Sequence, residues 1–256
     1  MRRSVLLAVV AGALAAGPAV AEHMTIALST AEVKISSNFT GAPITLFGVI
    51  ERDAQSVSRS GHYQVATLVQ GPPESVIARR KDRILGVWAN TDSETILAAP
   101  SFYTVNASGN IDDLAEKLVL ERYRLGFANS RFDYRGRPQA NDPAAAEFRE
   151  AFLRIKQNAG LYSEQQDSVT FIGDSVFRTT VWVPANAPVG FYTVRVFLFA
   201  DGALLAQADE SFRISKTGFE QYLSVFSREK SFVYGVVCVV LALFTGWLGG
   251  VVFRRD

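Results

Sequence analysis

Few residues in this chain could carry out acid–base or nucleophilic chemistry. It contains only two histidines, His23 and His62, and a single cysteine. The Ser175 hydroxyl could act as a nucleophile, but only with a basic group beside it, and both histidines lie far upstream. We therefore expect Gly173–Ser175 to form a turn between two strands.

The segment Phe171–Val176 resembles the nucleophile block of GDS-type esterases. In those enzymes the histidine base follows the serine late in the chain, in an Asp-x-x-His sequence that this chain lacks. Asp112-Asp113 is typical of a helix start rather than of a catalytic carboxylate pair, and no phosphate-binding loop or dinucleotide fingerprint occurs. We expect no esterase, and no enzyme of another kind.

A processed N-terminus could also form a copper site. If cleavage exposed Glu22, the new amine, the His23 imidazole and the Met24 thioether could bind the metal. Chain termini are usually solvated, however, and no zinc-ligand spacing is present. We expect no metal and no cofactor.

Small residues recur every four positions near the C-terminus, at Cys238, Ala242, Gly246 and Gly250. On a membrane helix such a line allows another helix to approach closely. It predicts a helix-packing face, for a partner or a second copy of the chain. Small residues are also common in spanning helices, so the alternative is that this line has no role in packing.

The stretch Phe232–Phe253 contains no charged residue and is long enough to cross a bilayer, for which about 20 apolar residues suffice. A buried helix of this length in a soluble protein would normally show a polar stripe. We therefore predict a transmembrane helix over 232–253, followed by a short cytoplasmic tail, 254–256.

The N-terminus predicts a cleaved signal peptide over residues 1–21. Arg2 and Arg3 precede an apolar run, Val5–Ala16, and Ala19–Ala21 supplies a small-x-small cleavage site. Basic residues flank the predicted span equally on both sides, so the signal peptide decides the orientation. The body is then expected outside the membrane that holds the anchor, and its lack of cysteine fits a bacterial periplasm at least as well as a eukaryotic cell surface.

Composition narrows the classes of partner. Removing Arg2 and Arg3 from the 26 basic residues leaves 24 against 25 acidic residues, a formal charge of −1. That balance disfavours nucleic acid and an anionic lipid surface as principal partners. The cysteine lies in the predicted span, so the exported body of about 200 residues must fold without a disulfide, which its size allows.

Residues 22–216 are predicted to be mainly β, as an immunoglobulin-like β-sandwich with a helical insertion near 110–160. The best marker is Gly190-x-Tyr192-x-Val194, which has the spacing of an immunoglobulin F strand, where the tyrosine hydroxyl bonds back to the preceding turn. Asp201-Gly202 predicts a hairpin turn after it. Two smaller β domains flanking the helices are the alternative. Residues 217–231 form a juxtamembrane linker.

Two helices are predicted inside the insertion. The first has Asn110 as its N-cap and a helical period from Ile111 to Tyr123. The second is capped by Asp142 and ends before Gly160, with inward residues that we expect at the following positions: Ala144, Ala145, Phe148, Ala151, Phe152 and Ile155. Upstream, Val76–Arg83 and Ile84–Trp88 predict two strands joined by a charged, solvated turn.

The layout resembles the alphaproteobacterial transmembrane family Alph_Pro_TM. The resemblance rests on the signal peptide, Asn38–Gly41 leading into Ile44–Gly48, the corner Pro188–Tyr192 and the single final span. It implies no activity, cofactor or catalytic residue. Some members are encoded beside sulfite-exporter-like permeases, which implies an accessory role. We expect a non-catalytic binding or accessory subunit of an envelope or transporter complex; the alternative is a tethered ligand- or metal-binding domain.

Overall fold

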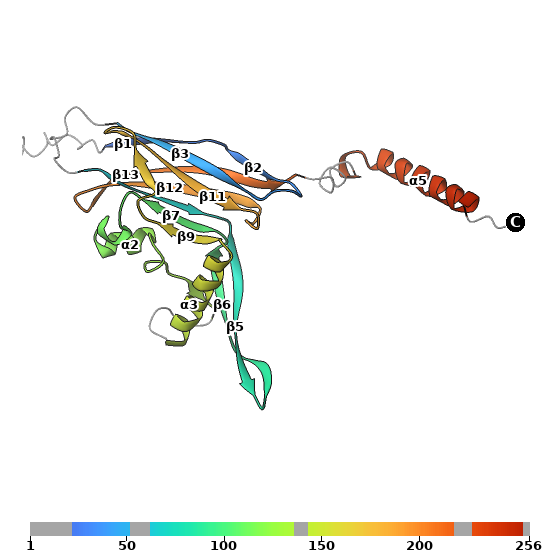
Figure 1. The fold of residues 1–256 in the computed structure, drawn as a ribbon, viewed down its shortest axis with the longest axis horizontal. Helices are drawn as coiled ribbons and strands as arrows, with labels where there is room; N and C mark the ends of the chain where they lie inside the picture. Colours follow the sequence, from blue (N-terminus) through green and yellow to red (C-terminus); the bar gives the residue numbers. More distant parts are fainter. Residues whose placement is uncertain (1–21, 52–61, 136–142, 218–226, 253–256) are drawn as a thin grey trace, which may run out of the picture.

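The computed structural model describes residues 22–51, 62–135, 143–217 and 227–252. The predicted signal peptide lies outside these residues. The body consists of two stacked β-sheets, with helices and a third, smaller sheet on the outer face of the larger one (Figure 1). The chain is mainly β, as predicted, and ends in one long apolar helix.

The first sheet has four antiparallel strands. In spatial order they are β1 (His23–Leu28), β3 (Gly41–Glu51), β11 (Val176–Pro184) and β10 (Val169–Phe171). The alternating burial of β3 and β11 turns one face inward and leaves the other exposed, as expected for a sheet that is covered on one side.

The second sheet has six strands. Their order is β2 (Glu32–Ile35), β13 (Ala203–Lys216), β12 (Gly190–Ala200), β4 (Gln64–Gln70), β7 (Tyr103–Ala107) and β9 (Tyr162–Gln165). Strand β4 pairs with β12, and in the first sheet β3 pairs with β11. Strands from before and after the helices therefore share both sheets.

The sandwich core fills the space between these two sheets. Each strand contributes every second side chain, as in Leu46 of β3, Phe177 of β11 and Val194 of β12. Gly48 lies opposite Phe177 in the register of β3 and β11, and the Phe177 ring occupies the space where a Cβ would stand. The glycine is therefore needed for close packing rather than for backbone freedom.

The F-strand prediction is confirmed at Tyr192. Its ring is fully buried between the sheets, and its hydroxyl donates a hydrogen bond of 2.6 Å to the Pro188 carbonyl in the preceding turn. This contact fixes the corner between β11 and β12. Burial raises the pKa of Tyr192 above its ordinary value, so the hydroxyl stays a proton donor.

A second core covers the opposite face of the six-stranded sheet. The centre of β4, all of β7 and the end of β12 are buried without alternation, because both faces of these strands are covered. The ring of Phe197 points away from the sandwich core, into a cluster with Leu120 and Phe152 of the insertion. The insertion is thus a third layer.

The insertion begins earlier than the predicted 110–160, with a long hairpin between β4 and β7 whose turn also differs from the prediction. Strands β5 (Pro73–Ile84) and β6 (Val87–Pro100) pair antiparallel around Leu85-Gly86. The basic run Arg79–Arg83 lies within β5 rather than in the turn. The turn lies at Leu85-Gly86 instead, where both residues adopt positive φ, the conformation that glycine favours. The hairpin stands out from the body, and β8 (Asp133–Tyr134) pairs only near its base (Figure 1).

The first predicted helix is split in two. A 3-10 turn, η1 (Ile111–Asp113), is capped by the Asn110 side chain, and α2 (Lys117–Tyr123) follows after a break. Leu118, expected on the inner face, is exposed. The break turns Leu114 and Leu120 into the same core, which a continuous helix would not do.

The second helix, α3 (Pro143–Asn158), forms as predicted, with Pro143 first and Gly160 beyond its end at φ +69°. Its inner face includes Phe148 and Phe152, but Ile155 is 63% exposed. The predicted cap Asp142 lies outside the described residues. Helix α5 (Ser231–Val252) covers the predicted span and is not buried against the rest of the described chain.

Candidate functional site

The predicted turn at Ser175 is confirmed. Gly173 has φ +79°, and the Ser175 carbonyl accepts a 2.8 Å hydrogen bond from the Ile50 amide of β3. The serine therefore links β11 to the neighbouring strand through its backbone. This contact holds the turn between β10 and β11 against β3.

The N-terminal copper ligands are not brought together. His23 begins β1 and is exposed, whereas the next residue, Met24, points into the sandwich core and is 4% exposed. Successive side chains of a strand point to opposite faces, so the imidazole and the thioether diverge. Within the described ranges, no three His, Cys, Asp or Glu side chains are grouped as metal ligands.

The small residues of the predicted packing face lie along α5. Cys238, Ala242, Gly246 and Gly250 are all exposed. A methyl group added at Gly246 or Gly250 would meet no atom of the described chain. The surface is open to a second helix, and its use in packing stays a prediction.

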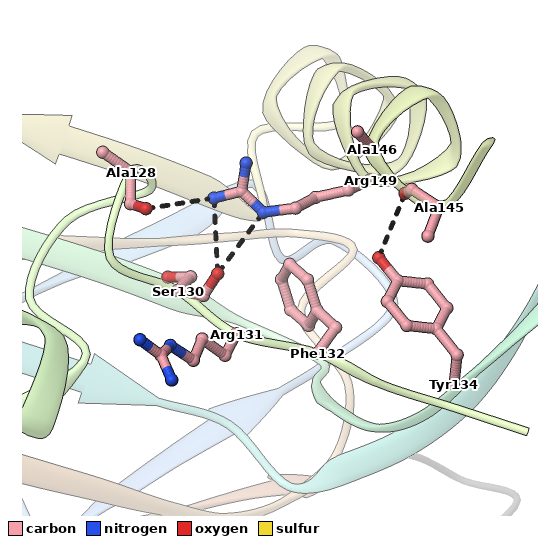
Figure 2. A pocket seen from close by; sticks show the side chains of 8 residues that line it. All are labelled: Ala128, Ser130, Arg131, Phe132, Tyr134, Ala145, Ala146 and Arg149. Carbon is pink, nitrogen blue, oxygen red and sulfur yellow. Dashed lines mark hydrogen bonds between the residues drawn. The ribbon is translucent and has the colours of Figure 1, made fainter. Parts of the chain in front are cut away.

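A pocket of about 250 Å³ lies between α3 and the loop after α2 (Figure 2). The Arg149 guanidinium enters it from α3 and donates hydrogen bonds to the carbonyls of Phe127, Ala128 and Ser130. These bonds give backbone acceptors of the loop a side-chain partner from α3, in addition to the Ser130 amide that already donates to the Phe127 carbonyl. Arg149 therefore holds α3 against the loop.

Tyr134 closes the other side of this pocket. Its hydroxyl donates a 3.4 Å hydrogen bond to the Ala145 carbonyl at the start of α3 (Figure 2). Burial raises the pKa of Tyr134, although the Arg149 guanidinium acts in the opposite direction. A neutral phenol and an arginine occupied by carbonyls fit a structural joint better than a reaction centre.

A larger groove, of about 710 Å³, runs between β5 and the outer side of α3. Its apolar lining includes Ile77, which is 56% exposed, and Ile155. The remaining lining residues are Val76, Ala78–Lys81, Glu147, Phe148, Glu150–Phe152, Arg154 and Lys156. A concave, partly apolar surface of this size is able to take a partner segment.

One wall of the groove is a sheet edge. Strand β5 lies at the end of its sheet and is paired only with β6 in the described part of the chain. An edge strand presents backbone N–H and C=O groups that can pair with an added strand. The groove thus offers backbone hydrogen bonds on one side and the apolar and charged side chains of α3 on the other.

Two ion pairs connect β5 and α3. Lys156 pairs with Glu74 near the base, where its ammonium also lies 5.7 Å from the centre of the Phe152 ring. Arg80 pairs with Glu147 at 3.1 Å further out. These pairs are separated by six residues of β5 and nine of α3, or roughly 14–20 Å. That length suits an extended segment of about five residues.

The groove is positively charged overall. Arg79, Arg80, Lys81, Arg154 and Lys156 line it, against the acidic residues Glu147 and Glu150. The surplus favours an acidic occupant. The sequence showed the basic run but not its place, because the pairing of β5 and the position of α3 depend on the tertiary fold.

These elements define a class of protein: an immunoglobulin-like β-sandwich with a helical insertion and one C-terminal helix long and apolar enough to span a membrane. The chain belongs to the family described as "Putative transmembrane protein (Alph_Pro_TM)", which it matches over residues 23–255. The resemblance noted in the sequence is confirmed.

Comparison with curated proteins finds no match. Among solved structures, the chain is similar to AggA, the major subunit of aggregative adherence fimbriae type I from Escherichia coli. The two share 13% identity at a TM-score of 0.28, over 77% of this chain and 97% of AggA.

Proposed function

We propose that this protein is a non-catalytic accessory subunit of the bacterial inner membrane. The signal peptide 1–21 exports the body, α5 anchors it, and the sandwich is held in the periplasm. The groove between β5 and α3 binds an extended, acidic segment of another envelope protein. The observation that carries this proposal is the edge of β5, unpaired among the described residues, beside a basic, partly apolar groove.

The arrangement supports binding by strand addition. An extended segment lying along β5 would gain backbone hydrogen bonds and place alternate side chains against Ile77 and Ile155. Acidic side chains would meet Arg79 and Lys81, which form no ion pair with any described residue. Arg80 is different, because Asp82, Asp92 and Glu147 already surround it.

Site-directed photocrosslinking in the native membrane tests the groove. A benzoyl-phenylalanine at Ile77 should capture one envelope protein, identified by mass spectrometry. The same probe at Leu118, which is 75% exposed on α2 and outside the groove, should not. Replacing Arg79 and Lys81 by Glu should remove the Ile77 product. Equal capture from both positions, or capture of this chain alone, would contradict the accessory role.

The orientation needs its own test. Alkaline phosphatase folds only in the periplasm, so a fusion after Lys216 should be active and a fusion after Asp256 inactive. The small-residue face is tested by Gly246→Leu with Gly250→Leu, which should lower recovery of the partner if α5 packs against it. Unchanged recovery would confine recognition to the groove.

A further inference from the structure

The tip of the β5–β6 hairpin gathers four exposed apolar side chains. Leu85 at the apex is 100% exposed, Val87 and Trp88 are each 68% exposed, and Ile84 is 51% exposed. Cross-strand partners share a face, so Ile84 and Val87 lie on one side and Trp88, opposite Arg83, on the other. Apolar side chains therefore surround the tip, and only an environment that encloses it could bury them.

The turn itself shows that folding does not explain Leu85. Both Leu85-Gly86 and Asp201-Gly202 are two-residue hairpin turns, and their first residues have the same φ of 49°. Asp tolerates this conformation, whereas Leu does so at a cost. The Leu85 backbone is therefore strained and its side chain is fully exposed, and a binding role for this leucine explains what folding does not.

Basic residues follow directly behind the apolar tip. Arg79, Lys81 and Arg83 form no ion pair with any described residue, and the Arg83 side chain bonds only the Gly86 carbonyl. Four residues of strand separate Leu85 from Lys81, about 13 Å. Apolar groups that enter a membrane interface reach roughly 5–10 Å deep, which would leave these cations among the lipid headgroups.

The hairpin also begins at the end of the sandwich that leads to the anchor. Strand β4 pairs with β12, and β12 with β13, both antiparallel, so β4 and β13 run in the same direction. Pro72, just before β5, lies beside Gly190, whose partner in β13 is Ile214. The hairpin root and the exit of the chain toward α5 are therefore neighbours.

We propose that the hairpin tip inserts into the interface of the same bilayer that holds α5, with Leu85 and Trp88 among the upper acyl chains and Arg79, Lys81 and Arg83 on anionic headgroups. Aromatic and aliphatic side chains followed by cations match this interface. The tip would bind weakly alone, but the anchor keeps it at an effective concentration of roughly millimolar. This inference depends on the anchor and shares Arg79 and Lys81 with the groove. Leu85→Asp leaves the lining of the groove unchanged and therefore separates the two proposals.

The test uses the full chain in lipid vesicles. Cys238→Ala with Val87→Cys provides one cysteine at the tip for an environment-sensitive fluorophore. Cys238→Ala with Ala203→Cys provides a matched label at the start of β13, beside Ala200 and therefore at the end of β12 away from Gly190. In vesicles of phosphatidylcholine and phosphatidylglycerol, the label at 87 should emit at shorter wavelength and lose most of its intensity to nitroxide lipids. The label at 203 should do neither.

Two variants complete the experiment. Leu85→Asp should return the emission at 87 to that of the label at 203, while the unfolding temperature shows that the body stays folded. Arg79, Lys81 and Arg83 changed together to Gln should reduce quenching to its level in phosphatidylcholine alone. Emission insensitive to nitroxide lipids overturns the proposal. A shift to shorter wavelength without nitroxide quenching also overturns it, in favour of a protein pocket.

Discussion

The two faces of the six-stranded sheet are covered in different ways. One face packs on the four-stranded sheet, with alternating side chains and a corner closed by the hydrogen bond from the Tyr192 hydroxyl to the Pro188 carbonyl. The other carries the insertion, which contains η1 and α2 separated by a break, the longer helix α3, and a hairpin that projects from the body (Figure 1). Both parts expose large apolar side chains. Those of the sandwich, such as Phe47 and Trp182, lie on the outer face of strands paired on both sides, whereas Leu85, Val87 and Trp88 gather at a projecting tip.

This contrast separates a scaffold from a recognition surface. Exposed apolar groups and an unpaired strand edge reduce stability or solubility, and proteins keep them where they bind something. The groove and the hairpin tip both lie on the insertion, and each combines exposed apolar side chains with basic ones. If the comparison is right, substitutions in the sandwich should change stability most, and those in the insertion should change binding.

The largest loss of stability is expected from Gly48→Ala. The added methyl group would overlap the Phe177 ring in the sandwich core, and overpacking of this kind costs about 2–3 kcal/mol. Urea unfolding of the body should show a lower midpoint with an unchanged slope. Phe177→Leu in the same chain should recover part of the loss, and a double variant no more stable than Gly48→Ala would contradict this packing.

Tyr192→Phe should have the next largest effect. It removes the hydroxyl that donates to the Pro188 carbonyl and leaves that acceptor without its partner, at a cost of about 1–2 kcal/mol. The matched control is Tyr63→Phe. The Tyr63 hydroxyl donates a 3.2 Å hydrogen bond to the Glu22 side chain near the surface. Equal losses in the two variants would show that the corner has no special role.

The sequence predicted the sandwich better than the insertion, for a physical reason. Strand β11 and the first half of β12 alternate exposed and buried side chains, and this period of two is local information. Tyr192 could be assigned to a corner from three residues alone. Helix α5 was equally clear, because its length and lack of charge are sufficient.

The insertion depends on contacts that no local pattern contains. Strand β9 was missed because only Tyr162 of its four residues is buried, with its hydroxyl bonded to the Pro100 carbonyl. The split between η1 and α2 follows from packing Leu114 and Leu120 into one core. The groove could not be predicted because it forms between β5 and α3, which lie far apart in the sequence.

Leu85→Asn sharpens the comparison in the opposite direction. Asn adopts positive φ more readily than Leu, so this substitution should stabilise the hairpin by about 0.5 kcal/mol. Asp201→Leu, in the matching turn of the sandwich, should destabilise by a similar amount. Hydrogen exchange of the amides beside each turn measures both. A slower-exchanging hairpin that no longer enters vesicles would show that Leu85 is kept for binding.

The smallest effect is expected at Glu164, where the insertion meets the sheet. Burial raises the pKa of this carboxyl, although its hydrogen bond from the Phe127 amide acts in the opposite direction. A raised pKa means that the folded state holds the proton more tightly than the unfolded state, so Glu164 lowers stability as pH rises through and above its ordinary value.

Glu164→Gln keeps an acceptor for Phe127 without the charge. It should stabilise the body at neutral pH by only a few tenths of a kcal/mol, because solvent still reaches this side chain. The difference should vanish in acid, and a gain that persisted below pH ~3, where the carboxyl is protonated in both states, would show that charge is not the cause.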